Sequence, residues 1–221
     1  MGKVYFISGI DTDAGKSYCT GWLAREWTNQ GQRVITQKFV QTGDCGYSED
    51  IDLHRKIMDV EPFPEDIDHT TAPMVFSYPC SPHLAARLDN REIDFKVIES
   101  ATDKLSNNYD VVLIEGAGGL MVPLKDEYLT IDYIKEHDLP LIFVVHGGLG
   151  SINHALLGLE AIKARGIRLE YLLYNKVYDS EDSIIADETR KYLGDWVKRH
   201  FPDTLILDVP RIFLPPKKRR L

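Results

Sequence analysis

The sequence contains few cysteines, and their spacing excludes two kinds of site. Cys19, Cys45 and Cys80 are the only three, and no two of them form a C-x-x-C pair. An odd number of cysteines without paired spacing argues against both a disulfide framework and a zinc site. Because reduced thiols are typical of the cytoplasm, the cysteines predict a cytoplasmic protein.

Long apolar runs and an excess of basic residues are also missing. No run approaches the ~20 apolar residues that cross a bilayer, and the N-terminal stretch is too quickly polar for a signal peptide. The 34 acidic and 26 basic residues give a net charge of -8. Such a surface repels nucleic-acid phosphates and anionic lipid, so we expect no nucleic-acid or membrane partner. The basic run at 217–220, KKRR, is typical of a solvated tail.

Short apolar runs alternate with helical patterns along the chain. Strands are predicted at 4–10, 33–40, 110–117, 140–146, 171–177 and 204–209, and helices at 16–30, 50–58, 81–89, 94–107, 130–137, 151–165 and 180–200. Successive apolar residues in the strands indicate burial on both faces. The alternation predicts an α/β fold with a doubly wound, mostly parallel sheet flanked by helices, and ligands at the carboxyl ends of its strands. We expect one domain over residues 1–221, in which residues 40–80 form a segment that lies outside the sheet.

The segment GIDTDAGKS, residues 9–17, nearly matches the phosphate-binding pattern G-x-x-x-x-G-K-[ST]. Its first glycine stands one residue early. The segment follows an apolar run and opens a helical one, so its backbone N–H groups and the helix start can bind an anion. Lys16 would reach the phosphates and the Ser17 hydroxyl would bind Mg²⁺. The alternative is a strand-to-helix turn with a surface lysine.

Three charged residues stand near other strand ends. Glu115 closes an apolar run and precedes a glycine-rich segment, and a charge in that position needs a partner. We favour a metal role for it over an acid that caps a strand edge. Lys38 ends another strand and Asp50 begins a helix. Taken separately, these two are equally compatible with a solvated lysine and a helix N-cap.

Two further segments contain candidate binding groups. In HGGLGSINHA, 146–155, the N–H groups of Gly150, Ser151 and Ile152 can bind an anion, although a tight turn capped by Ser151 fits equally well. The pair Asn175-Lys176 ends a strand, where an amide can read the edge of a base. His83 and His154 lack a second ligand at metal spacing, so a structural or substrate-lining role is expected for both.

Five segments together resemble the dethiobiotin synthetase family: SGIDTDAGKS, QKFVQTG, YPCSPHLAA, IEGAGGLMVPL and LGSINHALL. They follow the family's order from residue 4 to about 177, and the family's loop form G-x-D-T-x-x-G-K-[ST] accounts for the early glycine. The resemblance implies an ATP-dependent cyclo-ligase that converts 7,8-diaminopelargonic acid and CO₂ to dethiobiotin through a carbamate and a carbamic-phosphoric anhydride. It also implies ATP as co-substrate, Mg²⁺ as cofactor, and a homodimer with the substrate site at its interface.

The resemblance also assigns roles to individual residues. The catalytic residues it implies are Lys16, Lys38 and Thr12. The nucleotide-binding residues are Asp13, Ala14, Gly15, Lys16, Ser17, Tyr18, Glu115, Gly118, Asn175 and Lys176. The substrate-binding residues are Thr12, Lys38, Thr42, Gly118, Gly150, Ser151, Ile152 and Asn153. The metal ligands are Ser17, Asp50 and Glu115.

Two departures from the family pattern change what we expect. Gly148 stands where relatives often carry a lysine, which removes a positive charge near the substrate tail. After DVPRIF the sequence ends in LPPKKRRL, where relatives typically continue with another helix near the base, so we expect weak discrimination between bases.

The alternative function is a P-loop switch ATPase of the partitioning or metal-chaperone type, acting through a protein partner. Many such ATPases carry an additional lysine at the start of the loop. This chain has Asp11 and Asp13 in that region, and acidic side chains suit a diamine better than a second set of phosphates.

Overall fold

A six-stranded parallel sheet forms the centre of the computed structural model, which describes residues 1–212. Its strand order is β10-β9-β8-β1-β5-β2, and every neighbouring pair is parallel. The strands are β1 (Lys3–Gly9), β2 (Val34–Lys38), β5 (Val111–Gly119), β8 (Leu141–His146), β9 (Leu169–Asn175) and β10 (Leu205–Val209). These are the six strands that the sequence predicts, and the predicted fold class is confirmed.

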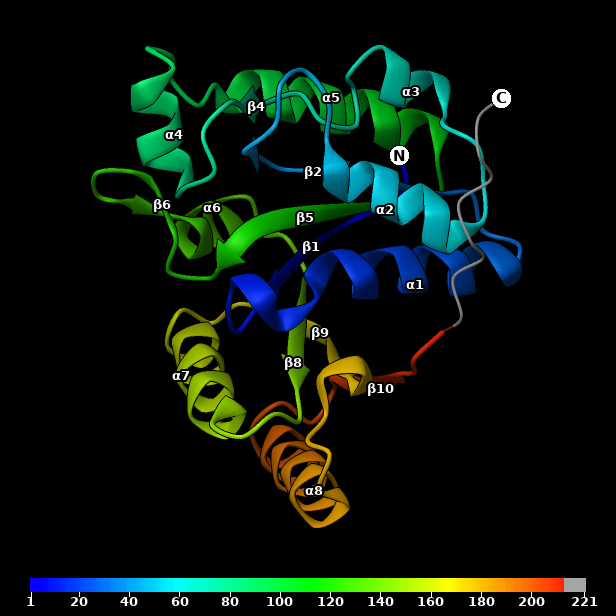
Figure 1. Cartoon of the computed structure of the whole chain (residues 1–221), viewed down its shortest axis with the longest axis vertical. Helices are drawn as coiled ribbons and strands as arrows, with labels where there is room; N and C mark the ends of the chain where they lie inside the picture. The colour runs from blue at the N-terminus through cyan, green and yellow to red at the C-terminus, as the bar shows by residue number, and fades with distance from the viewer. Residues whose placement is uncertain (213–221) are drawn as a thin grey trace.

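Helices cover both faces of this sheet. They are α1 (Lys16–Asn29), α2 (Glu49–Met58), α3 (Pro64–Ile67), α4 (Pro82–Leu88), α5 (Phe95–Asn108), α6 (Thr130–Glu136), α7 (Ser151–Ala164) and α8 (Ser183–His200), with short 3₁₀ turns η1 (Thr12–Ala14) and η2 (Lys176–Tyr178). All but the short α3 were predicted. Figure 1 shows α1 and α2 side by side across the sheet, with α7 and α8 together at its lower end.

The core consists of two apolar layers, one on each face of the sheet. Along β1, Tyr5 and Ile7 join the layer that contains Leu23 of α1, whereas Phe6 joins the layer on the opposite face. Burial of a large apolar side chain contributes about 1.5–3 kcal/mol, so neither face can be left uncovered. This two-sided packing holds the carboxyl ends of the strands in fixed relative positions.

Four short strands lie outside the main sheet. β3 (Gln41–Thr42) pairs with β4 (Val75–Phe76), and β6 (Pro123–Lys125) forms an antiparallel hairpin with β7 (Tyr128–Leu129). Residues 40–80 therefore leave the sheet only in part, because α2 returns to contact α1 and β2.

β5 is longer than the sequence suggested. It continues through Gly119, which pairs with Gly9 of β1, so Glu115 lies within the strand and does not close it. Glycine permits this continuation because a Cβ at Gly116 would come within 2.8 Å of Phe6 Cε1.

Two expectations concern the end of the chain and the membrane. The KKRR run and the ending LPPKKRRL lie outside the described residues, and so does the open base pocket inferred from them. Within residues 1–212, no helix has the length and apolar character needed to cross a membrane.

Candidate active site

The segment after β1 forms a loop around the lysine that begins α1. Lys16 Nζ folds back and donates hydrogen bonds to Asp11 O at 2.9 Å and Thr12 O at 3.3 Å. Burial lowers the pKa of Lys16 to about 8, against the opposing charge of Glu115. The N-cap of α1 is Gly15, which offers no side-chain acceptor to the first-turn N–H groups. Unpaired helix-start N–H groups above a lysine form an anion site.

Two predicted glycines shape this loop. Gly15 has φ 78°, and a Cβ there would lie 2.3 Å from Asn175 Nδ2 and 2.6 Å from Tyr178 Cε2. Only glycine fits both the left-handed conformation and the space. Gly118 of β5 has φ 63°, and its Cβ position lies 3.8 Å from Thr12 Oγ1, so it faces the loop.

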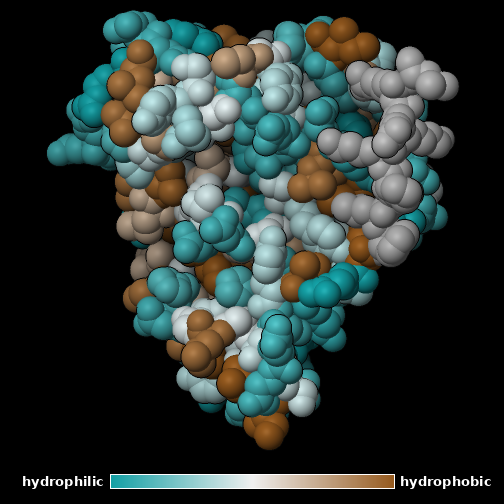
Figure 2. Space-filling model, in the orientation of Figure 1, coloured by the Kyte–Doolittle hydropathy of each residue, from teal (hydrophilic) through white to brown (hydrophobic). Residues whose placement is uncertain are grey.

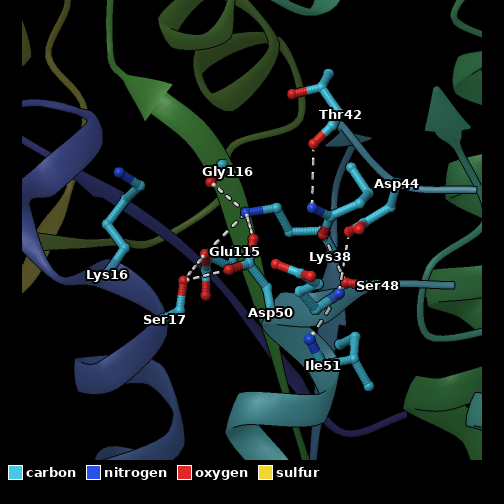
Figure 3. A network of polar contacts seen from close by, with 12 residues as sticks. Lys16, Ser17, Lys38, Thr42, Asp44, Ser48, Asp50, Ile51, Glu115 and Gly116 are labelled. Carbon is cyan, nitrogen blue, oxygen red and sulfur yellow. Dashed lines mark hydrogen bonds and ion pairs between the residues drawn. The ribbon is translucent and has the colours of Figure 1, made fainter. Parts of the chain in front are cut away.

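Three predicted metal ligands converge beside this loop. Ser17 Oγ lies 2.7 Å from Asp50 Oδ1 and 2.8 Å from Glu115 Oε1. Lys38 Nζ lies 2.8 Å from the same Glu115 oxygen, forms an ion pair with Asp50, and donates to Gly116 O at 3.3 Å. Figure 3 shows these side chains meeting at one point, with Lys16 to one side. The groups come from α1, α2, β2 and β5.

The charges in this cluster are buried and stabilise one another. Burial by itself would raise the pKa of Glu115, but Lys38 and His54 hold it well below its ordinary range. Burial would lower the pKa of Lys38, and the charges of Glu115 and Asp50 raise it to about 12. The strand register places Lys38 and Glu115 opposite each other on β2 and β5. Both groups are therefore charged at neutral pH.

The donor set fits magnesium. Two carboxylates and a hydroxyl are hard oxygen ligands, the kind that Mg²⁺ prefers. Within residues 1–212 no three His, Cys, Asp or Glu side chains gather as a metal site. With three protein ligands, the remaining octahedral positions of Mg²⁺ would be taken by phosphate oxygens and water. Asp50 does not cap α2, because Ser48 is the N-cap and accepts from Ile51 N.

The predicted anion site at the start of α7 has a buried, unpartnered hydroxyl. Gly150, with φ 89°, is the N-cap and provides no side-chain acceptor. Ser151 is the first helical residue, so the alternative in which it caps the turn is wrong. Its N–H donates to Gly148 O at 3.0 Å, and its buried Oγ has no hydrogen-bond partner among the described residues. Ile152 is half-buried and Asn153 is exposed.

A cavity of about 350 Å³ lies between the phosphate loop and α7. Gly9 and Asp11 line it on the loop side, and His154 and Leu157 line it from α7. His154 lines this cavity, and its contact with a substrate stays a prediction. Thr42 is half-buried on β3 and lies apart from the Lys38 cluster in Figure 3, so its substrate role stays a prediction.

Three of the predicted nucleotide-binding residues are engaged in contacts within the protein. Asn175 is fully buried; its Nδ2 donates to Ala14 O at 3.1 Å, and its Oδ1 accepts from Val177 N. Lys176 is exposed and pairs with Asp208 at 3.1 Å. Tyr18 Oη donates to Pro210 O at 3.0 Å. Asn175 thus holds the loop in place, and contact of these residues with a base stays a prediction.

Asn175→Ala is expected to destabilise the protein by about 1–3 kcal/mol, because it leaves Ala14 O without its donor. The affinity for ADP should also fall, because the hydrogen bond from Asn175 to Ala14 O no longer holds the loop in position. Chemical denaturation and ADP titration measure the two effects, with the exposed Asn107→Ala as control. Unchanged stability and affinity would show that the Asn175 contact does not hold the loop.

Sequence reasoning missed His54, which lies directly behind Glu115. The His54 side chain is fully buried, and its Nε2 lies 2.7 Å from Glu115 Oε2. One signal was present in the sequence: Asp50 and His54 are four residues apart, so a helix over 50–58 places them on one face.

Comparison with known proteins agrees with this geometry. A family model described as an AAA domain matches residues 3–207. The chain is 48% identical over 205 residues to ATP-dependent dethiobiotin synthetase BioD 2 of Pasteurella multocida (strain Pm70), covering 93% of this chain and 96% of the relative. It is 46% identical to ATP-dependent dethiobiotin synthetase BioD of Chlorobaculum tepidum, covering 94% of this chain and 87% of that one.

A solved structure supports the fold alone. The signal recognition particle receptor FtsY of Elizabethkingia anophelis superposes with a TM-score of 0.53 at 16% identity, over 93% of this chain and 57% of that chain. The identities to the synthetases, over nearly the full length of both partners, decide the family. The chain belongs to the ATP-dependent dethiobiotin synthetase family, whose members are P-loop ligases.

Proposed function

We propose that this chain closes the ureido ring of dethiobiotin from 7,8-diaminopelargonic acid, CO₂ and ATP. The observation that carries the proposal is a phosphate loop that leads into the helix contributing Ser17 to the lysine–carboxylate cluster, and whose Gly9 and Asp11 line a cavity of about 350 Å³. Family membership supports the same reaction. The switch ATPase is not favoured, because the relatives that match over nearly their full length are named as synthetases.

The reaction takes three steps. One amine of the substrate adds to CO₂ and loses a proton, which gives a carbamate. A carbamate oxygen then takes the γ-phosphoryl group of ATP, which gives a carbamic-phosphoric anhydride and ADP. The second amine attacks the carbamate carbon and loses a proton, the C–O bond to phosphate breaks with release of inorganic phosphate, and the ring closes. Negative charge gathers on the carbamate and phosphoryl oxygens throughout.

The two lysines supply the positive charge that these oxygens require. Lys16 lies under the phosphate loop, where it neutralises the β- and γ-phosphates. Lys38 lies at the end of β2, where the carbamate and the transferring phosphoryl group would meet it. Fixed charges in a buried site stabilise a transition state without reorganising, and phosphoryl transfer needs little else from the protein.

Ser17, Asp50 and Glu115 would hold Mg²⁺. When bound, the ion neutralises phosphate charge and orients the γ-phosphoryl group. Both carboxylates already lie within hydrogen-bond distance of the Ser17 hydroxyl, which supports this assignment.

The cavity suits the diamine and its carboxylate tail. Asp11 on the loop side offers a carboxylate to a substrate amine. At the start of α7, the unpartnered Ser151 hydroxyl and the N–H group of Ile152 suit the substrate carboxylate, whereas the Ser151 N–H already donates to Gly148 O. Thr12, Gly118, Gly150, Ile152 and Asn153 keep the substrate roles that the resemblance implies, and a cytoplasmic location completes the proposal.

ADP release by the purified protein tests this function. With Mg·ATP and bicarbonate, release should depend on 7,8-diaminopelargonic acid. ADP release that ignores the diamine would contradict the proposal, and stimulation only by a partner protein would indicate the switch ATPase.

We also propose that two copies of this chain form a dimer through the face that bears the cavity. Met121, Leu149 and Leu157 are large apolar side chains that are 54%, 88% and 63% exposed. Met121 and Leu157 line the cavity itself. Figure 2 shows hydrophobic side chains gathered between the β6 hairpin and α7, where a second copy would cover them.

Leu157→Lys is expected to weaken dimerisation by about tenfold or more, since it places a charge at the centre of an apolar contact. The KM for the diamine should rise in parallel if the partner completes the substrate site. Analytical ultracentrifugation and steady-state kinetics measure both effects. Ile67→Lys, at an apolar position on α3 that is 75% exposed, is the control. A dimer of unchanged strength would show that the interface lies elsewhere.

A further inference from the structure

His54 of α2 lies behind the carboxylate of Glu115 and has no part in the chemistry described above. Its side chain is fully buried, and both ring nitrogens have a partner. Nε2 lies 2.7 Å from Glu115 Oε2, and Nδ1 lies 3.0 Å from Thr36 Oγ1. One partner of this histidine is thus a carboxylate assigned to the metal.

The carboxylate end of this set of hydrogen bonds has a fixed direction. Arg55 Nη1 lies 2.8 Å from Thr36 Oγ1 and can only donate. The ionised carboxylate of Glu115 can only accept, so His54 Nε2 is assigned as the donor to Oε2. The contacts therefore link Arg55, Thr36, His54 and Glu115, and the last of them is a hydrogen bond that His54 donates to the carboxylate.

The two oxygens of Glu115 have different tasks in this arrangement. Oε2 is held from behind by His54, whereas Oε1 faces Ser17 and Lys38, each at 2.8 Å. Because one oxygen is fixed, the carboxylate cannot rotate about its terminal bond without losing that contact. Oε1 is therefore kept on the side where phosphate and metal arrive.

α2 supplies both Asp50, an assigned metal ligand, and His54, which holds the Glu115 carboxylate. Asp50 and His54 are one turn apart, which places both on the side of the helix that faces the site. Helix contacts with α1 and β2 hold this face in position. One element therefore sets the geometry of both carboxylates.

We propose that His54 is a positioning residue, which orients Glu115 for the magnesium–nucleotide complex; this inference rests on the proposed function. Groups that hydrogen-bond a metal-binding carboxylate from behind typically contribute 10–100-fold to metal affinity or activity. A merely structural histidine would stabilise the fold and leave the magnesium dependence of nucleotide binding unchanged.

Equilibrium binding of ADP, measured with saturating Mg²⁺ and again with EDTA, separates these roles. In His54→Leu, the gain in ADP affinity that Mg²⁺ confers should fall by about tenfold or more, while affinity in EDTA stays as in wild type. In His54→Gln, whose amide nitrogen can still donate to Oε2, the gain should stay within about threefold of wild type.

Two further variants keep the test decisive. His137→Leu removes a histidine that contacts Glu99 far from the site, and it should leave the magnesium gain unchanged. Thr36→Val removes the partner of Nδ1 and should reduce the gain by about threefold. If His54→Leu does not fold, Thr36→Val decides, and an unchanged gain in that variant overturns the inference.

Other outcomes are equally clear. A His54→Leu protein that binds Mg·ADP like wild type overturns the inference, as does one that loses equal affinity with and without Mg²⁺. Failure of the proposed function shows separately, as wild-type ADP release that does not respond to the diamine.

Discussion

Lys16→Ala is expected to lower kcat/KM for ATP by about a hundredfold to a thousandfold, the usual effect of removing one preorganised group that stabilises transition-state charge. Lys16 is buried under the phosphate loop, and its Nζ contacts loop carbonyls at 2.9 and 3.3 Å. An alanine therefore removes the one loop cation in contact with Asp11 O and Thr12 O and puts no charge in its place.

Steady-state kinetics with ATP as the varied substrate measures this loss. Lys191→Ala, an exposed lysine on α8 that pairs with Asp195, is the matched control and should behave as wild type. Circular dichroism of the Lys16→Ala protein separates lost function from lost fold. A variant within about threefold of wild-type kcat/KM would show that Lys16 does not contact developing charge.

Lys38→Ala is expected to lower kcat by a similar factor and also to destabilise the protein. The lysine is 5% exposed, and Glu115 beside it is fully buried. Removing one partner of a buried ion pair typically costs about 3–5 kcal/mol, because the remaining charge stays buried. Thermal unfolding and turnover should therefore both report the substitution.

The double variant Lys38→Met with Glu115→Gln separates these effects, since it removes both charges of the buried Lys38–Glu115 pair and leaves only the partly exposed Asp50 without its lysine. Its stability should return toward that of the wild type, whereas turnover should stay as low as in Lys38→Ala or lower. Near-normal turnover by Lys38→Ala would show that this lysine does not neutralise the carbamate or the phosphoryl group.

The layers of this fold, helices on both faces of a sheet, could be predicted from the sequence. A sheet that is buried on both faces requires strands that are apolar on both faces, and such strands are visible as continuous apolar runs. Runs such as VYFIS in β1 and LIFVV in β8 have no polar face, and only a sheet covered on both sides accommodates them. The extent of β5 was harder to predict. The glycine-rich segment at 116–119, GAGG, signals a loop on composition, yet it continues the strand because it fits beside β1.

The site was predictable where a local pattern defines it and less so where distant residues meet. The phosphate loop is defined by one segment, GIDTDAGKS, and its predicted position between a strand and a helix is confirmed. Lys38, Asp50 and Glu115 were separately ambiguous, and their meeting depends on strand register and on the return of α2 over α1. His54 carried no motif, because its role depends on the far side of Glu115.

Transfer of carbon-13 from labelled bicarbonate into a cyclic urea tests the central claim most directly. Incubation of the purified protein with Mg·ATP, labelled bicarbonate and 7,8-diaminopelargonic acid should give dethiobiotin with the label in its ureido carbonyl. One ADP should form for each ring, and no ring should form if ATP or the diamine is omitted. ATP turnover at the same rate with no labelled ring in the products would contradict the account.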